Sequence, residues 1–142
     1  MDTRKRSTAG RLVLSAAVGA GALALGGGLA EGAARKATLS VHPPKHAKVG
    51  VQYTIKASGY SGKFDRIGIV GSKIKCPKNA VDAYATFGGF YVQTVKKHHS
   101  FKRKDEFKAS SAGKRYACVY LYDSADPGGN QKHKSKTFTV SQ

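Results

Sequence analysis

Short segments in which apolar and polar residues alternate restrict this chain to β-strands. The clearest segment is residues 49–58, where every second residue is apolar. A period of two places alternate side chains on opposite faces of a strand. The segment therefore predicts a strand with one buried face and one wet face, and the wet face carries Lys56 and Ser58. The glycines of residues 59–62 predict a turn after it.

Further segments of the same kind predict the rest of the structure. Strands are expected at residues 37–43, 66–70, 87–97, 115–122 and 137–141. Residues 115–122 are apolar on both faces, which is typical of a strand in the middle of a sheet. Asn79 can cap one helical turn over residues 79–86. Six or seven short strands with so little helix predict an all-β fold, an antiparallel β-sandwich.

A secretory signal peptide is predicted at residues 1–34. Four basic residues precede an uncharged apolar run, and small residues follow, with three plausible cleavage positions up to Ala34. The alternative is an uncleaved membrane anchor, because residues 12–30 hold no charge. Eleven of those nineteen residues are Gly or Ala, however, which favours cleavage. We therefore expect one exported domain at residues 35–142, extracellular or associated with the cell envelope, with no transmembrane segment after cleavage.

Cys76 and Cys118 are the two cysteines of the chain, and both lie in the part expected to be exported. In an oxidising compartment, two cysteines in a small domain most simply form one disulfide. Closing a loop between them would stabilise the fold by roughly 4 kcal/mol in the chain-entropy model. The alternatives are a metal pair and a catalytic thiol, which need partners that do not stand at ligand spacing. No metal and no cofactor is expected.

One stretch resembles a known family. In residues 112–118, Gly113 precedes Tyr116, and Tyr116 stands two residues before Cys118. This resembles the entry to the penultimate strand of immunoglobulin-like and fibronectin-type-III-like sandwiches. The resemblance implies that Tyr116 is a tyrosine corner, with its ring in the core and its hydroxyl bonded to nearby backbone. The chain departs from antibody-type domains because residues 49–58 hold no cysteine and tryptophan is absent.

A second likeness covers residues 37–142. The run Tyr-Ala-Cys-Val-Tyr-Leu at residues 116–121 and the closing residues 137–141 are similar to those of small secreted actinobacterial proteins with a single immunoglobulin-like domain. This resemblance implies an immunoglobulin-like sandwich of about seven strands. It implies no particular activity, because its motifs are structural.

The adjacent pair His98 and His99 is the best candidate for acid–base chemistry. Neighbouring residues on a strand point to opposite faces, and lysines surround the pair, so we expect a solvated loop instead. A small secreted nuclease is the alternative, with either histidine as the acid, Glu106 as the base and Arg103 on the phosphate. Nucleophile motifs and phosphate-binding glycine loops are absent from the sequence. We therefore expect a protein without catalytic activity.

Charge is the remaining signal. The chain has 25 Lys and Arg against 8 Asp and Glu, a formal charge of +17, and removing residues 1–34 leaves +15. Two segments concentrate it, a predicted loop at residues 96–108 and a predicted turn at residues 132–136. Their basic residues are Lys96, Lys97, Lys102, Arg103, Lys104, Lys108, Lys132, Lys134 and Lys136.

These segments predict a monomeric binding module that adheres electrostatically to a polyanion. Anionic cell-wall polymer, acidic polysaccharide, anionic lipid and nucleic acid are all possible ligands. A generally basic surface with no selected ligand is the alternative. A third possibility is a structural domain that binds another protein at a sheet edge.

Overall fold

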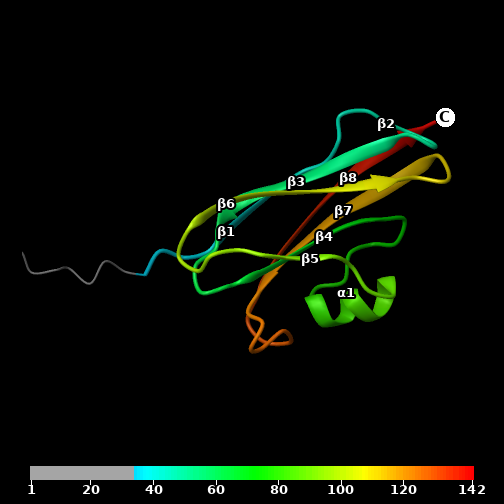
Figure 1. Ribbon diagram of the computed structural model, residues 1–142. Helices are drawn as coiled ribbons and strands as arrows, with labels where there is room; N and C mark the ends of the chain where they lie inside the picture. Colours follow the sequence, from blue (N-terminus) through cyan, green and yellow to red (C-terminus); the bar gives the residue numbers. More distant parts are fainter. Residues whose placement is uncertain (1–33) are drawn as a thin grey trace, which may run out of the picture. The chain divides into compact units, whose positions relative to one another are not determined.

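The computed structural model describes residues 34–142, so residues 1–33 of the predicted signal lie outside the described residues. Within that part, no helix is long and apolar enough to cross a membrane. The chain forms, in order, β1 (Thr38–His42), β2 (Ala47–Lys48), β3 (Gln52–Tyr60), β4 (Arg66–Ser72), α1 (Ala80–Phe87), β5 (Val92–Thr94), β6 (Ser100–Lys108), β7 (Gly113–Tyr122) and β8 (Lys132–Ser141), as Figure 1 shows.

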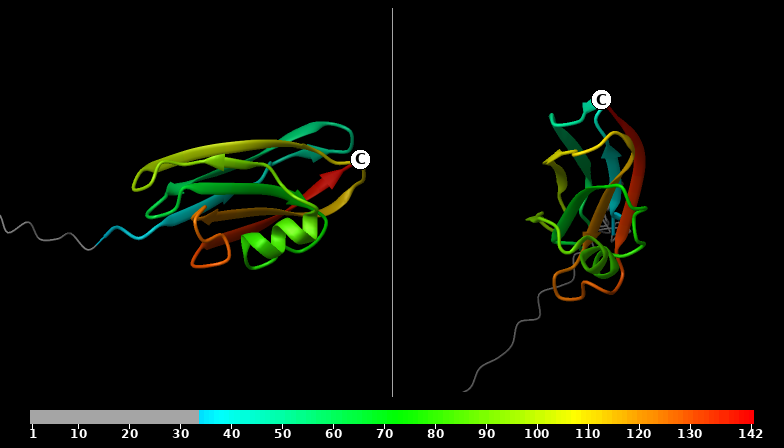
Figure 2. Two further views of the ribbon diagram at one scale, coloured as in Figure 1. Left: turned by 60° about the horizontal axis from the view of Figure 1, so that its bottom comes forward. Right: turned by 90° about the vertical axis from the view of Figure 1, so that its right-hand side faces the viewer.

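The strands form two sheets. One has three strands in the order β1-β3-β6, and the other has five in the order β2-β8-β7-β4-β5. Strand pairs are antiparallel except β2 and β8, which run parallel. The helix α1 contacts β7 and lies against the five-stranded sheet (Figure 2). The predicted all-β architecture with two sheets is confirmed.

The core lies between the two sheets. Val41 and Ile55 fill it from the three-stranded sheet, and Ile67, Val119 and Leu121 from the five-stranded one, all nearly without exposure. Fully burying one such side chain contributes about 1.5–3 kcal/mol. The prediction that residues 115–122 form a central strand is confirmed, because β7 lies between β4 and β8.

The predicted bounds of β3 are partly wrong. Gly50 adopts φ 74°, and the Val51 N–H donates to the Lys48 carbonyl at 3.2 Å, so the chain turns before the strand begins. Val51 is consequently exposed. At the other end, Gly59 continues the strand instead of turning. A Cβ at Gly59 would lie 2.1 Å from the Thr38 carbonyl oxygen, so only glycine permits this approach of β1.

The predicted helical turn is confirmed as α1. The Asn79 Oδ1 accepts a hydrogen bond from the Asp82 N–H at 2.8 Å, and Gly88, with φ 70°, ends the helix. The predicted strand at residues 87–97 is mostly wrong. Two consecutive glycines with positive φ turn the chain after α1, and only the short β5 remains of that strand.

The disulfide between Cys76 and Cys118 is confirmed, with a Cα–Cα distance of 5.6 Å. It ties β7 to the segment before α1, on the outer face of the five-stranded sheet. A second apolar cluster surrounds it there, containing Val70, Ala83 and Tyr120. The disulfide therefore fastens the helix layer to the sheet and does not cross the core.

The expected core position of Tyr116 is wrong. Alternation along β7 directs Ala117 and Val119 into the core, so Tyr116 lies on the outer face. It is half-buried there, with the Lys114 Nζ 5.5 Å from its ring centroid. The tyrosine hydroxyl that bonds to backbone belongs to Tyr120, which donates to the Pro77 carbonyl at 2.8 Å. Gly113 begins β7 with φ 119°.

Candidate functional site

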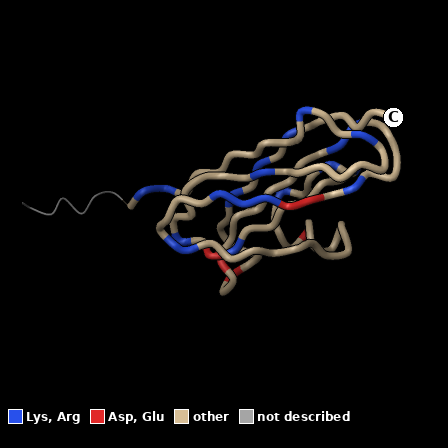
Figure 3. Tube along the Cα trace, turned by 45° about the horizontal axis from the view of Figure 1, so that its top comes forward, with Lys and Arg blue, Asp and Glu red and all other residues tan. Residues whose placement is uncertain are grey.

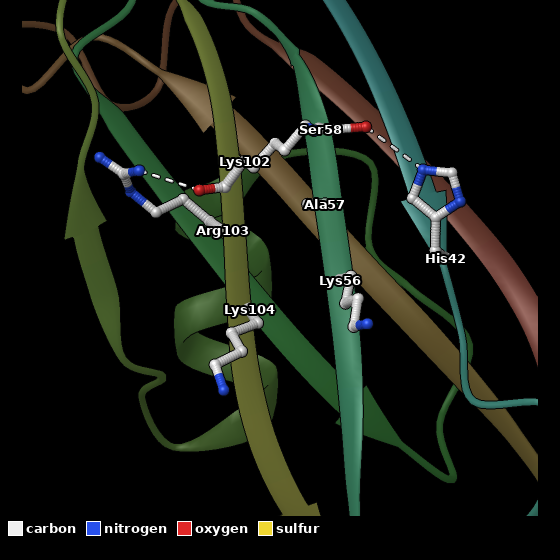
Figure 4. Close-up of a pocket in the computed structure, with 7 residues that line it drawn as sticks. All are labelled: His42, Lys56, Ala57, Ser58, Lys102, Arg103 and Lys104. Carbon is white, nitrogen blue, oxygen red and sulfur yellow. Dashed lines mark hydrogen bonds between the residues drawn. The ribbon is translucent and has the colours of Figure 1, made fainter.

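Three lysines and a histidine gather on the outer face of the three-stranded sheet. Lys56 on β3 stands opposite His42 on β1 and opposite Lys104 on β6, in one row across the sheet. In the next row Ser58 stands opposite Lys102. Neighbouring strands lie about 4.8 Å apart, so Lys56 and Lys104 are close neighbours. We call this surface, formed by these five residues, the cationic face (Figure 4).

The cationic face surrounds a shallow hollow of about 450 Å³. On one side the Ser58 Oγ and the His42 Nε2 lie 3.2 Å apart, and Figure 4 shows this bond joining β3 to β1. Lys56 and Lys102 are exposed and form no ion pair with residues 34–142. The Lys104 Nζ lies 3.7 Å from a Glu106 oxygen in a well-exposed pair, which water and salt weaken. Most of this positive charge is available to an external anion.

The cationic face ends where acidic residues begin on β6. Thr54 stands opposite Glu106, and Gln52 donates a hydrogen bond from its Nε2 to the same Glu106. Lys108 lies beyond this point, opposite Gln52. Figure 3 shows the resulting change of sign along β6. The cationic face is therefore confined to the rows of Lys56 and Ser58.

The predicted loop at residues 96–108 is largely strand, because its residues from Ser100 onward form β6. Alternation then separates Arg103 from Lys102 and Lys104. Arg103 donates to the Thr94 carbonyl at 2.9 Å and to the Lys102 carbonyl at 2.9 Å, and so ties β5 to β6. Arg103 therefore supports the edge of the sandwich, and its side chain points away from the face that carries Lys102 and Lys104.

Lys96 and Lys97 lie in the turn between β5 and β6. The Lys97 Nζ is 3.1 Å from an Asp123 oxygen. A hydrogen bond from the Ala125 N–H, with this lysine, holds the pKa of Asp123 below its ordinary value. The Lys96 carbonyl accepts a hydrogen bond from the buried Ser61 hydroxyl at 2.6 Å, which fixes the turn. Lys97 is thus partly neutralised, and both lysines lie away from the cationic face.

The predicted turn at residues 132–136 is also wrong, because these residues begin β8. They pair with residues 117–121, the C-terminal half of β7, although their side chains are polar. Lys134 and Lys136 stay exposed, and β8 runs beside β1 (Figure 4). Lys132 instead borders a hollow of about 360 Å³ with Arg35, Lys36, Lys63 and His98. The two basic segments therefore belong to different sheets.

The residues of the predicted nuclease site are not brought together. His99 lies in the turn before β6, with its Nδ1 2.8 Å from the Lys97 carbonyl. Glu106 stands about 20 Å farther along β6, at roughly 3.3 Å per residue. Arg103 is held against Thr94, as described above. Among residues 34–142, no three His, Cys, Asp or Glu side chains are grouped closely enough to hold a metal ion.

The sequence argument missed His42 and Lys56 as site residues. Lys56 was expected on the wet face of its strand, and that position is correct. What the sequence did not show is that β3 lies between β1 and β6, which sets Lys56 beside Lys104. The signal that could have identified Lys56 as a site residue was its position in the middle of the polar face of its strand.

Comparison with protein-family models and with curated proteins finds no match for this chain.

Proposed function

We propose that this protein is a secreted, non-catalytic binding module that adheres to an anionic polymer through the cationic face. The observation that carries the proposal is the cross-strand row of His42, Lys56 and Lys104, with Lys102 in the next row. Like charges on adjacent positions of a sheet repel one another. Among residues 34–142, only one exposed carboxylate, that of Glu106, lies beside Lys104, so a bound anion that supplies further negative charge makes this arrangement favourable.

The strand order supports an immunoglobulin-like domain as the scaffold. The β1-β3-β6 sheet corresponds to strands A, B and E of that fold, and β8-β7-β4-β5 to strands G, F, C and C′. The disulfide on the outer face and the absence of tryptophan depart from the antibody pattern. Export is supported by the disulfide, which persists in oxidising compartments, and by the predicted signal at residues 1–34.

The spacing of the lysines favours a ligand with repeated anionic groups. Lys102 and Lys104 are two residues apart on one strand, about 6.6 Å, while Lys56 is about 4.8 Å from Lys104 across the sheet. Lysine ammonium groups are mobile point charges and tolerate different anion geometries. The ligand class is therefore a flexible polyanion, such as a poly(glycerol phosphate) wall polymer or an acidic polysaccharide.

A charge-matched pair of variants tests the proposal. Lys56→Gln/Lys102→Gln/Lys104→Gln removes three charges from the cationic face. Lys36→Gln/Lys48→Gln/Lys63→Gln removes three exposed lysines that do not belong to the cationic face. At about 1 kcal/mol per lysine, the first variant should bind poly(glycerol phosphate) roughly 100-fold more weakly, and the control should change affinity little.

Titrations at several salt concentrations complete the test. Affinity of the wild type should fall steeply as salt rises, because binding releases condensed counterions, and the slope should be shallower for the first variant. Equal losses in both variants would show a generally basic surface with no selected site. Binding that ignored salt would contradict electrostatic adhesion altogether. Poly-glutamate, run in parallel, distinguishes carboxylate from phosphodiester ligands.

A further inference from the structure

One part of this strongly basic chain contains no basic residue. Residues 79–95 include neither Lys nor Arg, and their one charged residue is Asp82. They include four aromatic residues, Tyr84, Phe87, Phe90 and Tyr91. Depletion of charge together with enrichment in tyrosine and phenylalanine is the composition of the centre of a protein–protein interface.

This segment, together with the residues just before it, holds most of the exposed large apolar residues. Of the five large apolar residues that are exposed among residues 34–142, four lie in α1 or close to it in the sequence: Ile74, Val81, Tyr84 and Tyr91. Their exposed fractions run from 48% for Val81 to 69% for Tyr91. We call these four residues the apolar patch. Gathered apolar exposure of this kind marks an interaction site, whereas the isolated fifth residue, Val51, needs no such explanation.

The apolar patch borders a hollow of about 340 Å³ that is lined by apolar and aromatic residues. Val81 and Tyr84 form one wall, and Phe90, Tyr122 and Pro127 are on the others. A second hollow of about 730 Å³ lies beyond Phe90, with Tyr91 and Ile74 among its lining. Hollows beside exposed rings can receive apolar side chains of a partner.

This surface is rigidly supported. The Phe90 ring covers Gly68, where an added Cβ would lie 2.2 Å from the ring. Phe90 also stacks on Tyr120 at 5.9 Å and meets Tyr84 edge-on at 5.6 Å between ring centroids. The disulfide fastens the preceding segment to the sheet. A surface that is already ordered loses little conformational entropy when a partner docks.

We propose that the apolar patch is where a second copy of this chain docks, so that the protein forms a dimer with two-fold symmetry. This goes beyond the proposed function and replaces the monomer expected from the sequence. Two copies that each carry +15 repel one another, so they approach most readily through a surface with few lysines and arginines. Residues 79–95 provide that surface.

The charges around the apolar patch favour a second copy over a partner of one charge sign. Asp82 lies on α1, and Asp105 lines the larger hollow without an ion pair to any of residues 34–142. Lys73 lines the same hollow, and Lys75 and Lys78 follow it in the sequence. In a two-fold interface each residue meets a different residue of the other copy, and the reverse contact also occurs. A contact between a carboxylate of one copy and a lysine of the other therefore occurs twice in the dimer, once in each direction.

The test is the mass of the full chain, in the form that an expression host exports, measured by analytical ultracentrifugation from about 1 µM to 1 mM. The wild type should convert from monomer to dimer within this range. Val81→Lys and Tyr84→Lys should each weaken dimerisation more than about 10-fold, because a charge replaces an apolar contact in the interface. Val51→Lys is the matched control, since it makes the same change at the exposed apolar residue outside the patch.

Several results would overturn this proposal. A wild type that stays monomeric up to 1 mM excludes the second copy and leaves a different protein as the occupant. Equal effects of Val51→Lys and Val81→Lys exclude the patch as the contact. Circular dichroism of each variant should match the wild type, because all three positions are exposed. Raised salt screens repulsion between copies and should preserve the dimer, whereas it weakens polyanion binding, so failure of one proposal is distinct from failure of the other.

Discussion

His133 is a half-buried residue of β8 whose protonation affects stability. Its ring stacks on Tyr120 with centroids 5.1 Å apart, and its Nε2 is buried without a hydrogen-bond partner among residues 34–142. Burial lowers the pKa of His133 below its ordinary value, because a charged imidazolium would lose its hydration there. The neutral ring therefore belongs to the folded state.

We expect the free energy of unfolding to fall as the pH drops below about 6.5, where His133 of the unfolded chain takes up a proton while the folded form resists it. The loss should continue until the pH reaches the lowered pKa of the folded state and then level off. His133→Phe keeps a stacked ring without titration, so its stability should depend less on pH between about 6.5 and 5. Urea unfolding across this range measures the effect.

The exposed His46 supplies the control. His46→Phe should leave the pH dependence of the wild type unchanged. Asp65 and Asp123, whose pKa values are lowered, titrate in a more acidic range and do not overlap with the window used. A His133→Phe variant as sensitive to pH as the wild type would disprove the assignment to His133.

At the scale of elements, the disulfide decides how firmly the helix layer is attached. Cys118 lies on the outer face of β7, so its bond to Cys76 holds the segment before α1 without entering the core between the sheets. Cys76→Ser/Cys118→Ser should lower the free energy of unfolding by roughly 4 kcal/mol, since the unfolded chain regains the freedom of the closed loop. Chemical denaturation measures this change.

Limited trypsin digestion shows which segment loosens when the disulfide is removed. The double variant should be cut first at Lys73, Lys75 or Lys78, because these lysines lie in the segment that the disulfide no longer holds. Cleavage of β3 or β7 should require global unfolding in both forms. Cleavage in the core strands as early as at these lysines would show that the disulfide supports the whole sandwich.

The sequence predicted the elements well where burial determines the pattern. The strand at residues 115–122 is apolar on both faces because β7 is covered by the other sheet on one side and by α1 on the other. The prediction of strands failed where backbone pairing, and not the burial of side chains, forms the strand. Lys132 and Lys134 pair with β7 through the backbone, and their polar side chains gave no sign of it.

Only part of the candidate site could be predicted, because strand pairing also determines which of its residues lie together. Lys102 and Lys104 were recognised from their density along the chain. Lys56 joins them only because β3 and β6 are neighbours in a particular register, which is a long-range property. Arg103 points away from Lys102 and Lys104 because side chains alternate along β6. From the sequence a loop is expected there, and a loop predicts no such alternation. Such a site forms from strand order, which local patterns do not contain.

For the whole molecule, the two proposed surfaces are made of different residues. The cationic face belongs to the three-stranded sheet, whereas the apolar patch lies in α1 and the segments beside it, next to a hollow that extends to Asp105 and Glu106 of β6. Dimerisation through the patch uses none of the five residues of the cationic face. A dimer can therefore bind one polymer at two points or link two polymers.

This arrangement predicts that the wild type cross-links a long polyanion. Mixing it with long poly(glycerol phosphate) should raise light scattering, and its avidity should exceed that of a single site by about 10²–10⁴-fold where both faces engage one chain. Val81→Lys should bind a short polymer as the wild type does but should not raise scattering with the long one. Equal scattering from both proteins would show that cross-linking does not need the apolar patch.

The lysines of β6 have a consequence for solubility. β6 is the edge of its sheet, and an uncovered edge strand can pair with other chains and begin aggregation. Lys102, Lys104 and Lys108 charge this edge, and the bond from Arg103 to Thr94 covers part of it. Many copies crowded along one polymer would otherwise be at risk of growing a continuous sheet. The side chains proposed to recognise the ligand thus also keep the bound molecules separate.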